Sequence, residues 1–136
     1  MKKVKLQLIA LVLVATTGFT SCSNEDEPAI ITKKAFVSAV NGPAAGAVNE
    51  ELTLTVSFAV ENNCGVFNKF VETPTEANTK VIEVETVSEG ANCDAVPATK
   101  TVPYKFKATA AGTYILKFKK SATEFVTQTI VISSAA

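Results

Sequence analysis

The chain has 136 residues, of which 47% are hydrophobic, and its 13 acidic side chains are matched by 13 basic ones, all lysine. Without arginine the chain lacks the guanidinium fork that binds phosphate through two parallel hydrogen bonds, so we expect no nucleic-acid partner. The chain also has no histidine. This removes the most common general base and excludes Ser-His-Asp and Cys-His catalysis, so we expect no enzyme and no cofactor.

Residues 1–21 have the three-part layout of a secretory signal peptide. A basic start, MKKVK, precedes the apolar stretch LQLIALVLVA and the weakly polar segment TTGFTS. The apolar stretch is shorter than the roughly 20 residues that a membrane-spanning helix needs. We therefore assign residues 1–21 to a signal peptide and exclude them from the folded domain.

The motif FTSC at residues 19–22 resembles the bacterial lipobox, in which small residues precede a cysteine that is lipidated and becomes the first residue of the mature chain. Thr20, Ser21 and Cys22 fit this pattern, whereas Phe19 stands where the family usually has an aliphatic residue. The resemblance implies that Cys22 carries a lipid and anchors the protein to a membrane. The alternative is an ordinary thiol that follows a conventional cleavage site.

An acidic tract follows this cysteine. Glu25, Asp26 and Glu27 resemble the Bacteroidetes-type export signal, which sends lipoproteins to the outer face of the outer membrane. The resemblance implies a lipid-anchored protein that is exposed on the cell surface. These acids are also typical of a solvated linker, and the two readings are compatible. We assign residues 22–29 to an acidic tether.

Residues 30–136 are expected to form one domain, because the 115 residues left after removal of residues 1–21 suit a single core. Ten lysines and 13 acids remain, so the mature chain carries a charge of about −3. In the segment LTLTVSFAV, residues 52–60, apolar residues alternate with mostly small or hydroxylated ones, which predicts a strand with one buried face. The seven expected strands are residues 30–40, 52–60, 66–71, 80–87, 102–108, 114–118 and 125–133.

These strands and the turns between them predict an all-β fold, a single antiparallel β-sandwich with no helix after the signal peptide. The expected turns are NGPAAGA, ENNCG, TPTEAN, SEGANCDAVP, TAAG and KKSAT. In the segment AAGTYILKF, a glycine shortly before Tyr114 resembles the tyrosine corner of immunoglobulin-like domains. The resemblance implies an immunoglobulin-like sandwich in which the Tyr114 hydroxyl bonds back to the preceding connection. An ordinary half-buried strand residue is the alternative.

Cys64 and Cys93 are the two cysteines that remain when Cys22 carries a lipid. In an exported protein such a pair indicates a disulfide. A metal site is disfavoured, because the chain has no histidine and no CxxC spacing. In the immunoglobulin-like arrangement the loops that hold these cysteines share one end of the sandwich. The tether would enter at that end, so NGPAAGA, TPTEAN and TAAG would point away from the membrane.

Three further groups of residues raise alternatives. Glu83 and Glu85 lie two apart on one strand and share a face, which favours a solvated surface over a catalytic pair. Phe67 and Phe70 are three apart, so one is exposed or a bulge buries both. Oxygen-bearing residues near the cysteines suit turns better than a calcium site, and we expect no metal. They are Asn62, Asn63, Gly65, Gly90, Asn92 and Asp94.

The sequence therefore predicts a small cell-envelope lipoprotein whose sandwich is a non-catalytic binding or structural module on the outer-membrane surface. Its partners would be the membrane, through the lipid, and a protein or glycan ligand. The alternative is a periplasm-facing inhibitor or accessory subunit that binds a protein through a strand edge.

Overall fold

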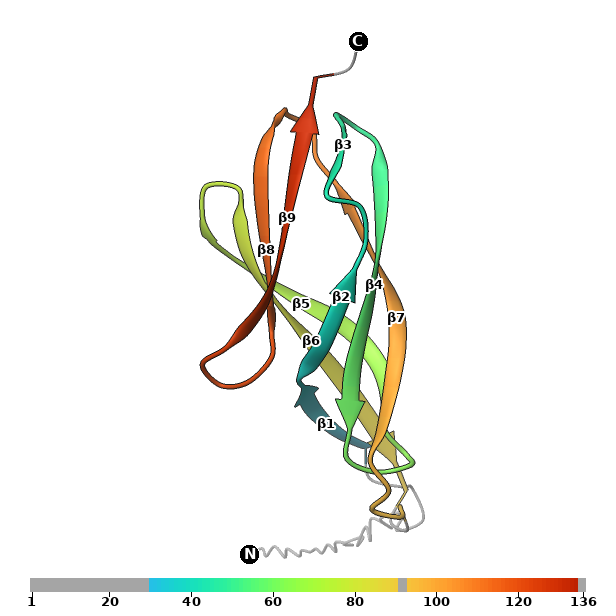
Figure 1. The fold of residues 1–136 in the computed structure, drawn as a ribbon. Helices are drawn as coiled ribbons and strands as arrows, with labels where there is room; N and C mark the ends of the chain where they lie inside the picture. Colours follow the sequence, from blue (N-terminus) through green and yellow to red (C-terminus); the bar gives the residue numbers. More distant parts are fainter. Residues whose placement is uncertain (1–29, 91–92, 135–136) are drawn as a thin grey trace, which may run out of the picture.

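A computed structural model describes residues 30–90 and 93–134 as nine strands in two sheets, and this part of the chain contains no helix (Figure 1). The strands are β1 (Ile30–Ala35), β2 (Val37–Asn41), β3 (Ala45–Ala47), β4 (Glu51–Val60), β5 (Val66–Glu76), β6 (Thr79–Glu89), β7 (Ala98–Lys107), β8 (Gly112–Lys119) and β9 (Phe125–Ser133). The all-β prediction is confirmed.

The larger sheet has six strands and is built around β6. Strand β5 pairs with one side of β6 as an antiparallel hairpin. Along its other side, β6 pairs first with β8 in parallel, at residues 79–82, and then with β1 in antiparallel, at residues 84–89. Strand β9 pairs with β8, and the short β3 completes the edge in parallel with β9. The smaller sheet has the antiparallel order β2-β4-β7.

The core lies between the two sheets and follows the alternation in the sequence. In β4 the side chains of Leu52, Leu54, Val56, Phe58 and Val60 are buried, while their neighbours face outward. Strands β7 and β8 contribute inward residues in the same way, while their lysines are exposed or half-buried. The prediction of strands with one buried face is therefore confirmed for all three strands.

A row of five aromatic side chains runs through the core and connects the sheets. Its members are Phe58 in β4, Phe67 and Phe70 in β5, Tyr104 in β7 and Phe118 in β8, with successive ring centroids 6.1, 4.9, 5.0 and 5.4 Å apart. Phe67 and Phe70 both pack against the core because β5 has a register shift between Phe67 and Lys69. The bulge that would bury both rings is therefore present.

The expected strand at residues 30–40 is two strands, which corrects the count of seven. Strand β1 belongs to the larger sheet and β2 to the smaller one, and the chain changes sheets at Phe36, which is 48% exposed. Ala35 and Val37 on either side of this residue are both buried in the core. A period-two pattern runs unbroken through such a crossing, so the sequence shows one strand where there are two.

Two expected turns contain strand instead. NGPAAGA includes β3, whose Gly46 lies so close to β4 that an added Cβ would be 2.8 Å from a methyl carbon of Leu52. This strand has no apolar alternation to reveal it. TPTEAN is mostly the end of β5, which continues through Pro74 because an edge strand tolerates a proline. The turn itself is only Ala77 and Asn78, and Asn78 has a left-handed φ of 57°, a conformation that asparagine tolerates.

The strand order differs from that of an immunoglobulin domain. There the fourth strand lies in the opposite sheet from the third and sixth. Here the corresponding strand, β6, lies between β5 and β8, because the tight turn at residues 77–78 folds it back onto β5 within one sheet. The β-sandwich is thus confirmed, but the immunoglobulin strand order is wrong for this chain. The prediction of purely antiparallel sheets is also wrong, because β6 pairs with β8 and β3 with β9 in parallel.

Replacing Phe118 by alanine should destabilise the sandwich by about 3–5 kcal/mol, because this fully buried ring touches Tyr104 at the end of the aromatic row. Urea unfolding with the disulfide intact measures the change. The matched control is Phe125→Ala, since Phe125 is 40% exposed and should shift the free energy of unfolding by no more than about 0.5 kcal/mol. Equal losses in the two variants would contradict the assigned core.

Candidate functional site

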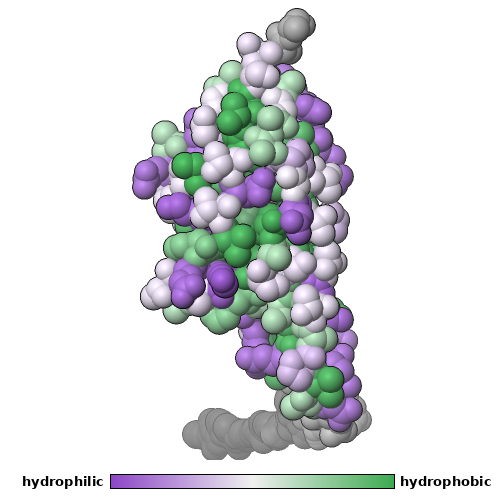
Figure 2. Space-filling view, viewed as in Figure 1, coloured by the Kyte–Doolittle hydropathy of each residue, from purple (hydrophilic) through white to green (hydrophobic). Residues whose placement is uncertain are grey.

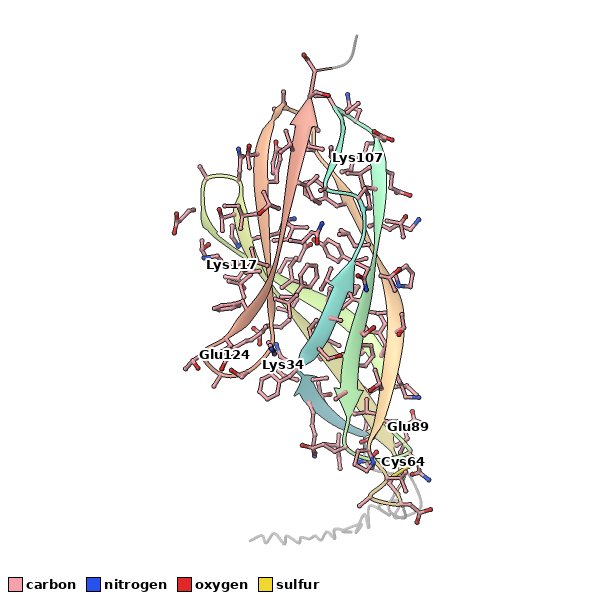
Figure 3. The ribbon with its side chains drawn as sticks, viewed as in Figure 1. Lys34, Cys64, Glu89, Lys107, Lys117 and Glu124 are labelled. Atoms are coloured by element: carbon pink, nitrogen blue, oxygen red, sulfur yellow. A yellow bond between two sulfur atoms is a disulfide. The ribbon has the colours of Figure 1, made fainter. Side chains whose placement is uncertain are left out.

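A disulfide joins Cys64 and Cys93 at one end of the sandwich, as the sequence predicts, with their Cα atoms 5.6 Å apart (Figure 3). The two loops are also linked by hydrogen bonds. The backbone N–H of Asp94 donates to Oδ1 of Asn63 at 3.0 Å, and the Asn63 backbone N–H donates to the Asp94 carbonyl at 3.1 Å. In the chain-entropy model a bridge over 29 residues contributes about 3.5 kcal/mol to stability. The two loops are therefore joined by a covalent bond and by hydrogen bonds.

The turn residues near the disulfide use their oxygens within the loops. Oδ1 of Asn62 accepts a hydrogen bond from the backbone N–H of Cys64 at 3.0 Å, as expected of turn chemistry. Asn92 lies outside the described residues. Within residues 30–90 and 93–134, no three His, Cys, Asp or Glu side chains converge where they could hold a metal ion.

Glu83 and Glu85 share the outer face of β6, and each meets a lysine of a neighbouring strand. Lys34 Nζ lies 3.6 Å from a carboxylate oxygen of Glu83, and Lys69 Nζ lies 3.8 Å from one of Glu85. Asn68 also donates to Glu85 at 2.8 Å. These contacts hold β1 and β5 against β6, which is a structural role for both carboxylates.

A cavity that the sequence does not reveal lies at the opposite end from the disulfide. It has a volume of about 330 Å³, and we call it the hairpin cavity because the β5–β6 hairpin forms one of its walls. Its lining residues are Glu72, Pro74, Glu76, Asn78, Thr79, Lys80, Phe106, Lys107 and Tyr114. In Figure 3, Lys107 of this lining and Cys64 of the disulfide lie at opposite ends of the sandwich.

The floor of the hairpin cavity is aromatic, and two charged residues of its lining, Glu72 and Lys80, are already connected. The rings of Phe106 and Tyr114 meet edge to face with centroids 5.4 Å apart, and Lys80 Nζ lies 5.9 Å from the Phe106 centroid. Lys80 also donates to Glu72 at 3.4 Å, and the Tyr104 hydroxyl donates to the same carboxylate. Glu72 is therefore held in place from two sides.

The hairpin is fixed to the rest of the sandwich at its turn. The carbonyl of Asn78 accepts a hydrogen bond from the backbone N–H of Ile115 at 2.8 Å, which attaches the turn to β8. Next to it, Gly112 has a φ of 151°, and an added Cβ there would be 3.2 Å from Nδ2 of Asn78. Glycine therefore allows the close approach of the two segments.

The predicted tyrosine corner is present beside this cavity. The Tyr114 hydroxyl donates to the carbonyl of Ala110 at 2.8 Å, so it bonds back to the connection that precedes its own strand. This bond gives the Tyr114 hydroxyl a hydrogen-bond partner and fixes the Tyr114 ring at the cavity.

Tyr104 is the most strongly perturbed acid of the described residues. Burial raises its pKa far above the ordinary value of 10, because ionisation would place a charge in the core. The hydrogen bond to Glu72, and the negative charge of that carboxylate, raise the pKa further. The Tyr104 phenol is therefore a permanent donor to Glu72 at physiological pH.

A second cavity, of about 210 Å³, lies near the disulfide end where β1 approaches the end of β4. Its rim includes Lys33 and Glu61, whose charged groups are 2.8 Å apart. The hydrogen bond and charge of Lys33 hold the pKa of Glu61 below its usual value. This rim is occupied by its own ion pair.

The predicted N-terminal features lie outside the described residues. These are the signal peptide at residues 1–21 and the tether at residues 22–29 with Cys22, Glu25, Asp26 and Glu27, and all of them stay predictions. In the part of the chain that the structure describes, no helix could cross a membrane.

Comparison with protein-family models, curated protein sequences and solved structures finds no match to this chain.

Raising the pH above about 10 should destabilise the protein through Tyr104. Because its pKa is raised by folding, the neutral phenol contributes its full stability below pH 10, and this contribution is lost as the pH rises further. Tyr104→Phe should cost about 1 kcal/mol at neutral pH and remove this alkaline loss. Urea unfolding as a function of pH measures both effects.

The control is Tyr114→Phe, which leaves Tyr104 as the only tyrosine. In this variant the ultraviolet absorbance of phenolate should rise only together with unfolding. A phenol that ionises freely in the folded variant would show that Tyr104 is not held by burial and Glu72.

Proposed function

We propose that this protein is a small lipoprotein of the bacterial cell envelope whose β-sandwich is a non-catalytic binding or structural module on the outer-membrane surface. Three features of the sequence support this location. They are the signal-peptide layout of residues 1–21, the lipobox-like motif that ends at Cys22 and the acids at residues 25–27. The disulfide supports export, because such bonds persist in oxidising compartments. The lack of histidine in the sequence supports a role without catalysis.

The observation that carries the proposal is that the N-terminal end of the domain and the hairpin cavity lie at opposite ends of the sandwich. Ile30, the first described residue, pairs with Glu89 beside the disulfide loops, whereas the hairpin cavity lies at the other end (Figures 1 and 3). Only seven residues separate Cys22 from Ile30. A lipid at Cys22 would therefore tether the disulfide end near the membrane and leave the cavity facing outward.

We also propose that the likeness to immunoglobulin-like domains is a local one. The tyrosine corner at Tyr114 and the shared end of the two cysteine loops support it. The likeness does not extend to the order of the strands, in which β6 lies between β5 and β8.

The alternative, a subunit that binds a partner through a strand edge, is disfavoured on one side of the sandwich. The edge strands there are β5 and β7, and each contains a proline, Pro74 or Pro103, within its ladder. A proline has no N–H and is accommodated where its nitrogen faces away from the neighbouring strand. Each outer edge thus lacks a donor that an added strand would need, and the register shifts in β5 interrupt its edge further.

Protease treatment of intact cells should remove an epitope tag placed after Ala136 while a periplasmic control protein survives. Cys22→Ala should abolish incorporation of labelled fatty acid and release the protein from the membrane fraction. Fatty-acid labelling that persists in this variant would refute lipidation at Cys22. A tag that is cleaved only after the envelope is broken would instead place the domain in the periplasm.

The orientation is tested by labelling single cysteines on intact cells with a bulky maleimide. Thr75→Cys, at the exposed end of β5, should react readily, whereas Val96→Cys, in the loop next to the disulfide, should be shielded. Both residues are exposed in the isolated protein, and Val96 is 56% exposed, so detergent-solubilised protein should label equally at both positions. Shielding of residue 75 with residue 96 open would reverse the proposed orientation.

A further inference from the structure

We propose that the hairpin cavity binds a neutral, hydroxyl-rich ligand, namely a single sugar ring of a glycan. The inference rests on the proposed binding function and names its site and ligand class. The cavity volume of about 330 Å³ is at the lower end of the range typical of small-molecule sites, which suits one ring rather than an extended chain.

The charges of the lining are balanced and therefore favour a ligand without net charge. Two acidic residues, Glu72 and Glu76, and two lysines, Lys80 and Lys107, line the same cavity. For an anion or a cation, attraction to one pair is offset by repulsion from the other, so a net charge gains little there and loses its hydration. A neutral ligand avoids that loss of hydration.

Hydroxyl groups match this mixture of donors and acceptors. A carboxylate only accepts hydrogen bonds and an ammonium group only donates them, whereas a hydroxyl does both. Neighbouring hydroxyls on a sugar ring can therefore donate to Glu76 and accept from Lys107. Both side chains are on exposed residues and make no ion pair within the described chain, so they are available to a ligand.

The apolar part of the lining suits the C–H face of a sugar. Phe106 is 4% exposed and lies at the floor of the cavity against Tyr114, and Pro74 lines the same cavity from β5. Aromatic rings provide large apolar contact surfaces. Polar groups at the rim and rings at the floor can thus bind a ligand that has hydroxyls around its edge and C–H groups on its face.

The site is organised before any ligand arrives. Glu72 is fixed by Tyr104 and Lys80, and the hairpin is attached to β8 through Asn78 and Ile115. Binding would therefore order few additional groups, which lowers its entropic cost. Only Glu76 and Lys107, on the rim, would need to adjust.

The protein carries its own optical probe for this site. It has no tryptophan and two tyrosines, and both are at the cavity, since Tyr114 lines it and Tyr104 donates to Glu72. Intrinsic fluorescence therefore reports on this region alone. The full chain, purified in a detergent without a sugar headgroup, should be titrated with glucose, galactose and mannose, and with glucuronic acid and glucosamine as charged counterparts.

At least one neutral sugar should change the tyrosine fluorescence with a dissociation constant of about 1 mM, which is typical of weak single-ring binding. The charged counterparts should bind about tenfold more weakly, because a net charge loses hydration in the cavity and the balanced lining offers no excess of the opposite charge. Amide shifts in nuclear magnetic resonance spectra should map to the β5–β6 hairpin and β7. Shifts confined to the disulfide end would overturn the assigned site.

Glu76→Gln and Lys107→Met should each weaken binding about fivefold or more, corresponding to loss of one hydrogen bond to a charged group. The matched control is Glu89→Gln, which changes an exposed carboxylate at the disulfide end and should leave the affinity unchanged. No response to any neutral sugar, or preference for a charged one, overturns the ligand class. Protease treatment of intact cells decides the location of the domain separately, so failure of one proposal is distinguishable from failure of the other.

Discussion

The aromatic row from Phe58 to Phe118 is the contact on which the rest of the structure depends, because it alternates between strands of both sheets. Phe67 and Phe70 take part in it only because β5 is bulged. The bulge allows an edge strand to cover the side of the core with two rings instead of one. Packing of this kind gives a small sandwich a continuous core without any tryptophan.

The aromatic row also connects the core with the hairpin cavity. Tyr104 belongs to the row through its ring and to the polar cluster through its hydroxyl, which bonds Glu72. The position of that carboxylate is thus determined by core packing rather than by the surface. Hydrophobic and hydrophilic side chains are interspersed on the face shown in Figure 2. The hairpin cavity is linked to the core through Glu72, which lines it and bonds Tyr104.

The sequence predicts the parts of this fold that follow from local alternation. Strand β9 has the expected bounds and β4 differs by one residue. The disulfide was predicted from a cysteine pair in an exported chain, and the tyrosine corner from a resemblance to immunoglobulin-like domains. The sequence could not show which strands pair with one another. Strand β6 lies between β5 and β8 because of a turn of two residues, and the small residues of β3 give no periodic signal. The cavity depends on that pairing, since Glu72 and Lys80 become neighbours only when the hairpin closes. The sequence signal for the turn that closes this hairpin was Asn78, a residue suited to the left-handed conformation.

The attachment of β1 has a mechanical consequence. All six of its residues pair with β6 in antiparallel, and the chain then crosses to the smaller sheet at Phe36. A force that pulls Ile30 along the strand would load these six pairs together, in shear, rather than open them one at a time. Beyond Glu89, the last residue of β6, the disulfide at Cys93 limits how far the adjoining loop can extend. A domain held by its N-terminal end would thus bear tension with its most strongly cross-linked region nearest the point of load.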